Sequence, residues 1–164
     1  MSPNPRPITE TQIKIAKPFV KWLSIFNAWI YQWSNGRWLG RYGGGDICVV
    51  KMTGAKSGQP RELPLMYVPY KDGLILVASF AGGPHHPTWY YNLIAHPDIE
   101  VSLRGKQLLL VARRASAEEK AAVWPLCVQH YRDYDLYQRR TTRDIPVFIC
   151  APRPVIASAA QRSS

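Results

Sequence analysis

"RELPLMYVPYKDGLILVASF", residues 61–80, decides the fold. Two apolar runs rich in leucine, valine and tyrosine flank the turn residues 71–73, so this stretch predicts a hairpin of strands 61–70 and 74–80. The preceding segment "DICVVKMT" (46–53) has the same character and is joined to the hairpin by a glycine-containing turn. We therefore expect three consecutive antiparallel strands here.

Further strands follow with short helices between them. Residues 99–115 form a second predicted hairpin, turned at Arg104–Gly105, and "IPVFICAP" (145–152) reads as a final strand. Residues 87–95 fit a short helix that begins with proline. Ser116 and Glu119 have the spacing of a capping box, which predicts a helix over 116–130. A short tyrosine-rich helix or loop covers 131–140.

This order of elements indicates the fold class. Hairpins dominate, and neither a βαβ alternation nor a Gly-x-Gly-x-x-Gly motif is present, which excludes a Rossmann fold. The sequence therefore predicts a mainly β protein with helical additions (α+β), built as an antiparallel barrel of about six strands. We expect one domain over residues 17–152, with disordered tails at 1–16 and 153–164.

An amphipathic helix is predicted over residues 17–35, outside the barrel. Its large apolar residues recur at helical spacing, with lysines and polar residues on the other side. The segment is too short and too interrupted to span a bilayer. With the arginines up to residue 41, it could lie in a lipid interface, or it could cap the barrel or a dimer partner.

Charge and cysteine usage narrow the partners and the compartment. The net charge is +10, and residues 1–61 hold nine of the 21 basic residues but only two of the 11 acids. This balance suggests an anionic partner, either phosphate groups, a phospholipid surface or nucleic acid. No nucleic-acid recognition motif is present, so we expect no nucleic acid. Three scattered cysteines and a polar N-terminus without an apolar signal core predict a cytoplasmic protein, at the inner face of the membrane if the helix meets lipid.

Two common kinds of reactive site are not expected. His85 and His86 are neighbours that point in opposite directions in extended chain, and no carboxylate or thiol lies nearby at a chelating spacing, so no metal site is predicted. No Gly-x-Ser-x-Gly motif is present, which argues against a serine hydrolase.

Two other segments can bind or react. In "TGAKSGQPR" (53–61), two glycines allow a tight turn whose N–H groups, with Lys56 and Arg61, could hold an anion, although an ordinary basic turn has the same composition. In "HYRDYDLYQRR", the tyrosines at spacing three would share one side of a helix. Their hydroxyls could donate into a cavity, or the rings could be a packing stripe.

Four segments in order resemble one family: "FNAWIYQWSNGRWLG", "TGAKSGQPRELPLMYV", "VASFAGGPHHPTWYYNLIAHPDIEV" and "YRDYDLYQRRTTRDIPVFIC". They look like the deazaflavin-dependent nitroreductase family, split β-barrel oxidoreductases that use reduced coenzyme F420. The resemblance runs from about Phe26 to Pro152. It implies a split β-barrel and hydride transfer to a quinone, nitroaromatic or activated enone.

The resemblance also implies the site residues. Those implied to bind the cofactor are Gly54, Lys56, Ser57, Gly58, Arg61, Ala78, Ser79, His86, Pro87, Thr88, Trp89 and Asn92. Those implied to act on the acceptor are Ser79, Tyr131, Tyr134 and Tyr137. Where the family has basic residues, this sequence has Ala55, Phe80 and His85, which leaves FMN as the alternative cofactor.

The expected mechanism assigns the hydride to the cofactor and leaves binding, orientation and hydrogen-bond donation to the protein. An FMN-dependent reductase is one alternative. Another is a carrier of a flavin, a haem-like molecule or a lipid on the same barrel, which would bind without turnover. A homodimer is compatible with each of these.

Overall fold

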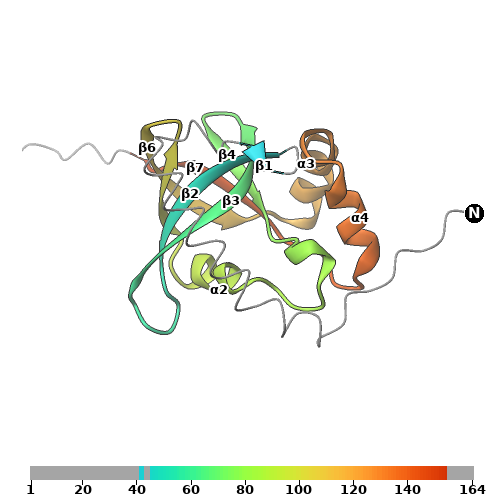
Figure 1. The fold of residues 1–164 in the computed structure, drawn as a ribbon, viewed down its shortest axis with the longest axis horizontal. Coiled ribbons are helices and arrows are strands. Elements are labelled where there is room, and N and C mark those ends of the chain that lie inside the picture. The colour runs from blue at the N-terminus through green and yellow to red at the C-terminus, as the bar shows by residue number, and fades with distance from the viewer. Residues whose placement is uncertain (1–40, 43–44, 155–164) are drawn as a thin grey trace, which may run out of the picture.

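The computed structural model describes residues 41–42 and 45–154, which form a closed antiparallel barrel with helices at its side and end (Figure 1). The elements, in chain order, are β1 (Arg41–Tyr42), β2 (Gly45–Thr53), β3 (Pro60–Tyr70), β4 (Gly73–Val77), the 3₁₀ turn η1 (Phe80–Gly82), α2 (Thr88–Ala95), β5 (Asp98–Leu103), β6 (Lys106–Arg114), α3 (Ala117–His130), α4 (Asp133–Arg140) and β7 (Val147–Pro152).

The barrel closes because β2 pairs on both of its edges. The sheet order is β1-β2-β3-β4-β7-β6-β5, and β2 pairs with β5 as well as with β3. Lys51 illustrates the closure, since it lies opposite Glu62 of β3 and opposite Glu100 of β5. Its Nζ is 3.9 Å from a Glu100 carboxylate oxygen. Strands β2 to β7 thus form the predicted six-stranded split β-barrel, and the two-residue β1 pairs with β2 beside it.

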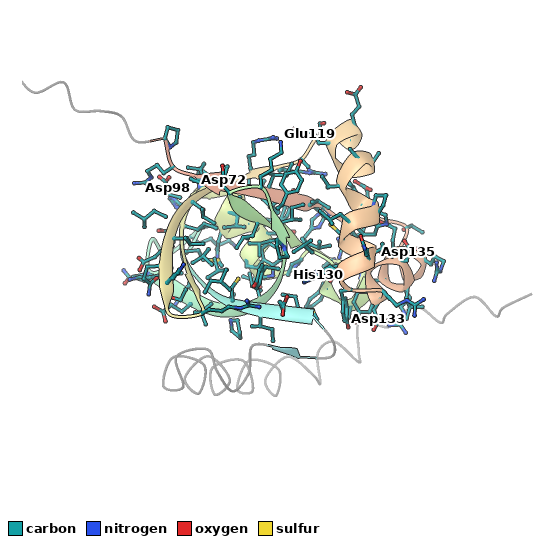
Figure 2. The ribbon with its side chains drawn as sticks, turned by 90° about the horizontal axis from the view of Figure 1, so that it is seen from above. Asp72, Asp98, Glu119, His130, Asp133 and Asp135 are labelled. Atoms are coloured by element: carbon teal, nitrogen blue, oxygen red, sulfur yellow. The ribbon has the colours of Figure 1, made fainter. Side chains whose placement is uncertain are left out.

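Strand β4 is apolar at consecutive positions because it is buried on both faces. Leu74 and Leu76 lie in the cluster inside the barrel, whereas Ile75 and Val77 lie in a second cluster outside it. Successive side chains of a strand point to opposite faces, so an element with a core on each side must be apolar throughout. The outer cluster includes Val123 of α3, which packs this helix against the barrel (Figure 2).

The β3–β4 turn requires glycine at its exit. Lys71 and Asp72 form the turn, and Lys71 has a φ of 51°. A Cβ atom on Gly73 would lie 1.9 Å from the carbonyl oxygen of Cys150 in β7. Strand β7 can therefore approach this turn only because residue 73 has no side chain.

Helix α3 begins at the predicted capping box. Ser116 Oγ accepts a hydrogen bond from the Glu119 N–H at 3.1 Å, and Glu119 Oε2 accepts one from the Ser116 N–H at 2.9 Å. The Glu119 carboxylate also accepts hydrogen bonds from both terminal nitrogens of Arg113, at 2.6 and 2.7 Å. These contacts lower the pKa of Glu119 to about 2, the Arg113 hydrogen bonds most and the Ser116 N–H next.

The structure corrects two boundaries. The strand predicted over 74–80 ends at Val77, because the Ser79 N–H turns back to the Val77 carbonyl and η1 follows. The tyrosines do not share one helix, since Tyr131 is the C-cap of α3 and only Tyr134 and Tyr137 lie in α4. The predicted helix 17–35, the tail 1–16 and most of the tail 153–164 lie outside the described residues.

Candidate active site

The β2–β3 loop has a geometry fixed by its own backbone. The Gly54 N–H donates to the Gln59 carbonyl at 2.8 Å, and the Gly58 N–H donates to the Gly54 carbonyl at 2.9 Å. Gly58 has a φ of 66°, and a Cβ on Gly54 would lie 2.6 Å from Ser57 Oγ. The predicted glycines are therefore needed for the turn itself. Several N–H groups expected to face an anion are used inside the loop.

The cations of this loop remain available to a ligand. Lys56 and Arg61 are exposed, and neither makes an ion pair within the described residues. Arg61 Nη2 donates to Ser57 Oγ at 3.4 Å, which brings this guanidinium back over the turn. An anionic group at this loop would be met mainly by side chains, with two positive charges and one hydroxyl.

Asn92 anchors the loop to α2. Its Oδ1 accepts the Ala55 N–H at 2.9 Å, and its Nδ2 contacts Met52 Sδ at 3.5 Å. The side chain is 7% exposed and is the one buried polar side chain in the described part of the chain. The resemblance implied that Asn92 lines the cofactor. Both ends of its amide hold protein groups, so Asn92 positions the loop.

Trp89 packs into the core of the barrel. It is 8% exposed and belongs to the cluster inside the barrel, with its ring centroid 5.9 Å from that of Phe148. Trp89 therefore attaches α2 to the barrel core. Pro87 is buried and is the N-cap of α2, and Thr88 is exposed at the first position of the helix.

The segment between β4 and α2 has an unusual backbone. Phe80, Ala81 and Gly82 all have positive φ, at 47°, 51° and 77°. Gly82 packs against α4, where an added Cβ would lie 2.7 Å from the Tyr137 carbonyl oxygen. Ser79 is half-buried just before this turn. Ala78 is fully buried, and both of its backbone groups are bonded within the protein, the N–H to the Pro146 carbonyl and the carbonyl to Arg143 Nη2.

Arg143 holds this segment and was not predicted from the sequence. It donates to the carbonyls of Gly83, Ser79 and Ala78, and its Nη1 lies 3.1 Å from His86 Nδ1. These partners lie 57 to 65 residues away in sequence. In the sequence, Arg143 lies just before the strand predicted over 145–152, and this position does not identify the groups to which Arg143 donates.

His86 is oriented by its neighbours. Its ring is stacked on Tyr90, with centroids 4.2 Å apart. Burial lowers the pKa of His86 below its usual value, and the charges of Arg143 and Arg114 lower it further. A neutral imidazole can accept the Arg143 hydrogen bond at Nδ1, which leaves the hydrogen on Nε2. His86 thus gives the 78–86 segment a side-chain contact with Arg143, in addition to the three carbonyls that Arg143 binds.

The three tyrosines separate into a pair and a core residue. The hydroxyls of Tyr131 and Tyr137 lie 3.2 Å apart, and the Tyr131 hydroxyl donates to Asp133 Oδ2 at 3.1 Å. Tyr134 is 2% exposed and packs in the outer cluster with Val123 and Cys127. The packing interpretation is correct for Tyr134, and a hydroxyl pair is formed by the other two.

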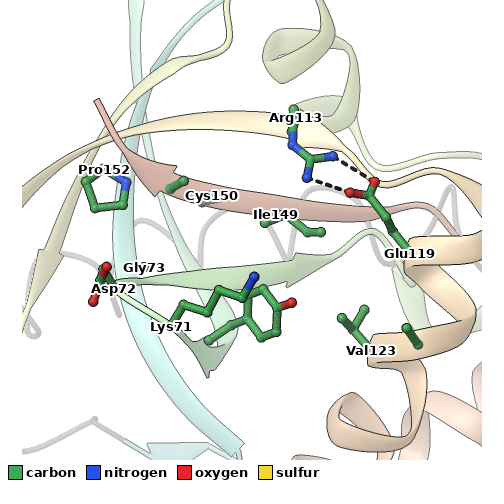
Figure 3. A pocket seen from close by; sticks show the side chains of 12 residues that line it. Lys71, Asp72, Gly73, Arg113, Glu119, Val123, Ile149, Cys150 and Pro152 are labelled. Carbon is green, nitrogen blue, oxygen red and sulfur yellow. Dashed lines mark hydrogen bonds and ion pairs between the residues drawn. The ribbon is translucent and has the colours of Figure 1, made fainter. Parts of the chain in front are cut away.

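A cavity of about 300 Å³ lies away from these residues, at the β3–β4 turn (Figure 3). In Figure 1 this turn is at the opposite end of the barrel from α2 and the β2–β3 loop. The Arg113 and Glu119 charges at its edge bond to each other. No cluster of three metal-ligating side chains occurs in residues 41–42 and 45–154, and no helix described there is long and apolar enough to cross a membrane.

Comparison with known proteins identifies the family. A family model described as F420H(2)-dependent quinone reductase matches residues 23–152. An F420H(2)-dependent quinone reductase of Mycobacterium tuberculosis is 35% identical over 128 residues, which cover 76% of this chain and 86% of the relative. A second protein of that organism, described as a putative F420H(2)-dependent quinone reductase, is 39% identical over 98 residues, covering 60% and 82%.

Solved structures agree with this result. A structure described as an F420-H2 dependent reductase (FDR-A) is 43% identical, covers 63% of this chain and 92% of its own, and has a TM-score of 0.59. One described as a domain-swapped dimer is 43% identical, covers 63% and 78%, and has a TM-score of 0.60. The chain belongs to the F420H(2)-dependent quinone reductase family.

Proposed function

We propose that this protein transfers a hydride from reduced coenzyme F420 to a quinone, at a site between the β2–β3 loop, the 78–86 segment and the Tyr131–Tyr137 pair. The family supports the cofactor and the reaction class. The observation that carries the assignment of the site is the hydroxyl pair at 3.2 Å, because α4, which presents Tyr137, packs on Gly82 of the 78–86 segment.

The residues present fit an anionic cofactor with a planar ring. Lys56, Arg61 and Ser57 offer two positive charges and a hydroxyl for the anionic tail. Ser79, whose hydroxyl makes no hydrogen bond within the described residues, is available to the ring. When bound, reduced F420 supplies the hydride, and the protein binds, orients and supplies hydrogen-bond donors.

The direction of the hydrogen bonds favours Tyr137 as the donor to the acceptor. Tyr131 uses its one hydroxyl hydrogen on Asp133, so the hydrogen between the two tyrosines comes from Tyr137. Tyr137 can turn this hydrogen to the quinone oxygen that becomes negative when the hydride arrives. Burial raises the pKa of Tyr131 above its usual value, and the contacts with Tyr137 and Asp133 raise it further, so Tyr131 stays protonated and keeps the pair in place.

Turnover without oxygen tests this function. The purified protein is mixed with reduced F420 and a soluble quinone, and the visible absorbance of the oxidised cofactor is followed. We expect the absorbance of oxidised F420 to reappear only when both protein and quinone are present. This oxidation of reduced F420 should be much faster than the oxidation of reduced FMN under the same conditions. A folded protein that binds F420 without oxidising it would support the carrier alternative. Equal rates with FMN would support the FMN-dependent reductase.

The same assay examines other acceptors. Nitroaromatics and activated enones also accept a hydride and develop negative charge on oxygen, so the Tyr137 hydroxyl could serve them equally. We propose them as additional substrates of the same site. A quinone as the sole substrate in a panel of such acceptors would contradict this extension.

Assembly and location remain proposals of their own. The related domain-swapped dimer supports a homodimer, which the mass in solution from light scattering would test.

Residues 17–41, of which the structure describes only Arg41, are basic and amphipathic in sequence, which supports peripheral contact with the inner face of the cell membrane. Equal flotation of the full chain and a chain beginning at Gly43 with anionic liposomes would contradict the membrane contact.

A further inference from the structure

A single guanidinium uses all three of its nitrogens on one segment. Arg143 Nε donates to the Gly83 carbonyl at 2.9 Å. Its Nη2 donates to the Ser79 carbonyl at 2.8 Å and to the Ala78 carbonyl at 3.1 Å, and its Nη1 lies 3.1 Å from His86 Nδ1. These four contacts span the chain from the end of β4 to the residue before the N-cap of α2.

The segment that Arg143 contacts is one that needs support. Three consecutive residues, Phe80 to Gly82, have left-handed backbone angles, and two of them carry side chains that disfavour such angles. Two local turns hold it, formed by the Gly82 N–H on the Ser79 carbonyl and the Gly83 N–H on the Phe80 carbonyl. A backbone of this kind persists only where its surroundings determine it strongly. Arg143 supplies the long-range part of that determination.

The fork geometry makes arginine specific for this position. A planar guanidinium holds five N–H donors at fixed angles, whereas a lysine ammonium is a single point on a flexible stem. Arg143 is partly buried, so water competes less with its hydrogen bonds than it would at an exposed position. A lysine at residue 143 would keep the positive charge and lose most of the simultaneous contacts.

We propose that Arg143 is a positioning residue that holds the 78–86 segment in the one conformation that accepts the cofactor ring. This inference rests on the proposed function for what is bound, and on the described contacts alone for the clamp. Arg143 follows α4, so the same residue also keeps the segment next to the helix that carries Tyr137.

The first test measures the clamp without any cofactor. Hydrogen–deuterium exchange of the segment is compared in the native protein, Arg143→Lys and Arg143→Ala, with Arg139→Lys as control, because Arg139 is exposed on α4 and pairs with Asp135. We expect exchange over residues 78–86 to accelerate in both Arg143 variants and not in the control. In Arg143→Ala the pKa of His86, followed by its ring proton signals, should also rise, since one of the positive charges that lower it is gone. Unchanged exchange in a folded Arg143→Ala would overturn the clamp.

The second test connects the clamp to binding. If only about one tenth of Arg143→Lys molecules have the competent segment, the Kd for oxidised F420 rises about tenfold, while turnover with saturating cofactor stays near the native value. Free guanidinium at low, non-denaturing concentration should restore part of the affinity of Arg143→Ala. Faster exchange with an unchanged Kd would overturn the positioning role. A native protein that does not bind F420 would refute the proposed function instead, and the exchange result would still decide the clamp.

Discussion

Replacing Asn92 by alanine should weaken cofactor binding from a position that we do not expect to touch the cofactor. The variant deletes the acceptor of the Ala55 N–H, a bond of 2.9 Å between α2 and the β2–β3 loop. A deleted partner of a buried backbone donor generally costs about 1–3 kcal/mol. Ala55 is half-buried, so water can replace part of the lost bond, and we expect about 1–2 kcal/mol.

The size of the binding effect follows from this energy. If the whole loss falls on the conformation of the loop, 1–2 kcal/mol corresponds to a fall of roughly 5- to 30-fold in cofactor affinity. Urea unfolding gives the loss of stability, and titration with oxidised F420 gives the Kd. Ile94→Ala, on the exposed side of the same helix at 52% exposure, is the control and should change neither strongly.

Met52→Leu separates the two ends of the amide. It removes the sulfur that Nδ2 contacts and leaves Oδ1 on the Ala55 N–H, so its affinity should lie nearer the native value than that of Asn92→Ala. The reasoning is refuted if Asn92→Ala loses stability as calculated but binds F420 as tightly as the native protein. The β2–β3 loop would then not contact the cofactor.

Three further outcomes are expected. Gly73→Ala should destabilise the protein by at least about 1–3 kcal/mol in urea unfolding, because its Cβ would collide with the Cys150 carbonyl and the hairpin must shift; an unchanged midpoint would contradict this. Glu119 has a pKa of about 2 in the folded protein against 4.5 as the ordinary value, so its stabilising effect is present above about pH 4.5 and is lost as the pH falls towards 2. Glu119→Gln should therefore flatten the pH dependence of stability in that window, and a parallel curve would show that the ionised Glu119, with its Arg113 and Ser116 hydrogen bonds, contributes nothing there. Burial raises the pKa of Cys127 to about 11, so the native protein should resist alkylation of this thiol near neutral pH. Mass spectrometry of the labelled peptides measures the alkylation, and rapid labelling would show that α3 opens.

Local patterns predicted most of the fold because local physics determines it. The sequence predicted both hairpins, with turns at 71–72 and 104–105 in the structure, and the capping box at Ser116. Each of these features depends on residues that are close together in sequence. Even the unbroken apolar run of β4 was informative, although its cause, a core on each face, is visible only in the structure.

The site was less predictable because its contacts join distant parts of the chain. The resemblance pointed to whole segments and gave no means of separating a residue that lines the site from one that supports it. Asn92 turned out to anchor a loop 37 residues away, and Tyr134 to fill the outer core. Arg143 was missed because an arginine near a strand has no recognisable spacing to the carbonyls that it binds.

The turnover of Tyr137→Phe relative to Tyr134→Phe, with quinone as acceptor and saturating reduced F420, tests the central claim most directly. Each variant removes one hydroxyl oxygen and keeps the ring, one from the hydrogen-bonded pair and one from the outer core. We expect Tyr137→Phe to lower turnover about 10- to 100-fold, equivalent to about 1.4–2.7 kcal/mol and the range of one good hydrogen bond, with Tyr134→Phe near the native rate. Equal turnover in the two variants, or a larger loss in Tyr134→Phe, would contradict reduction of the quinone beside the Tyr131–Tyr137 pair.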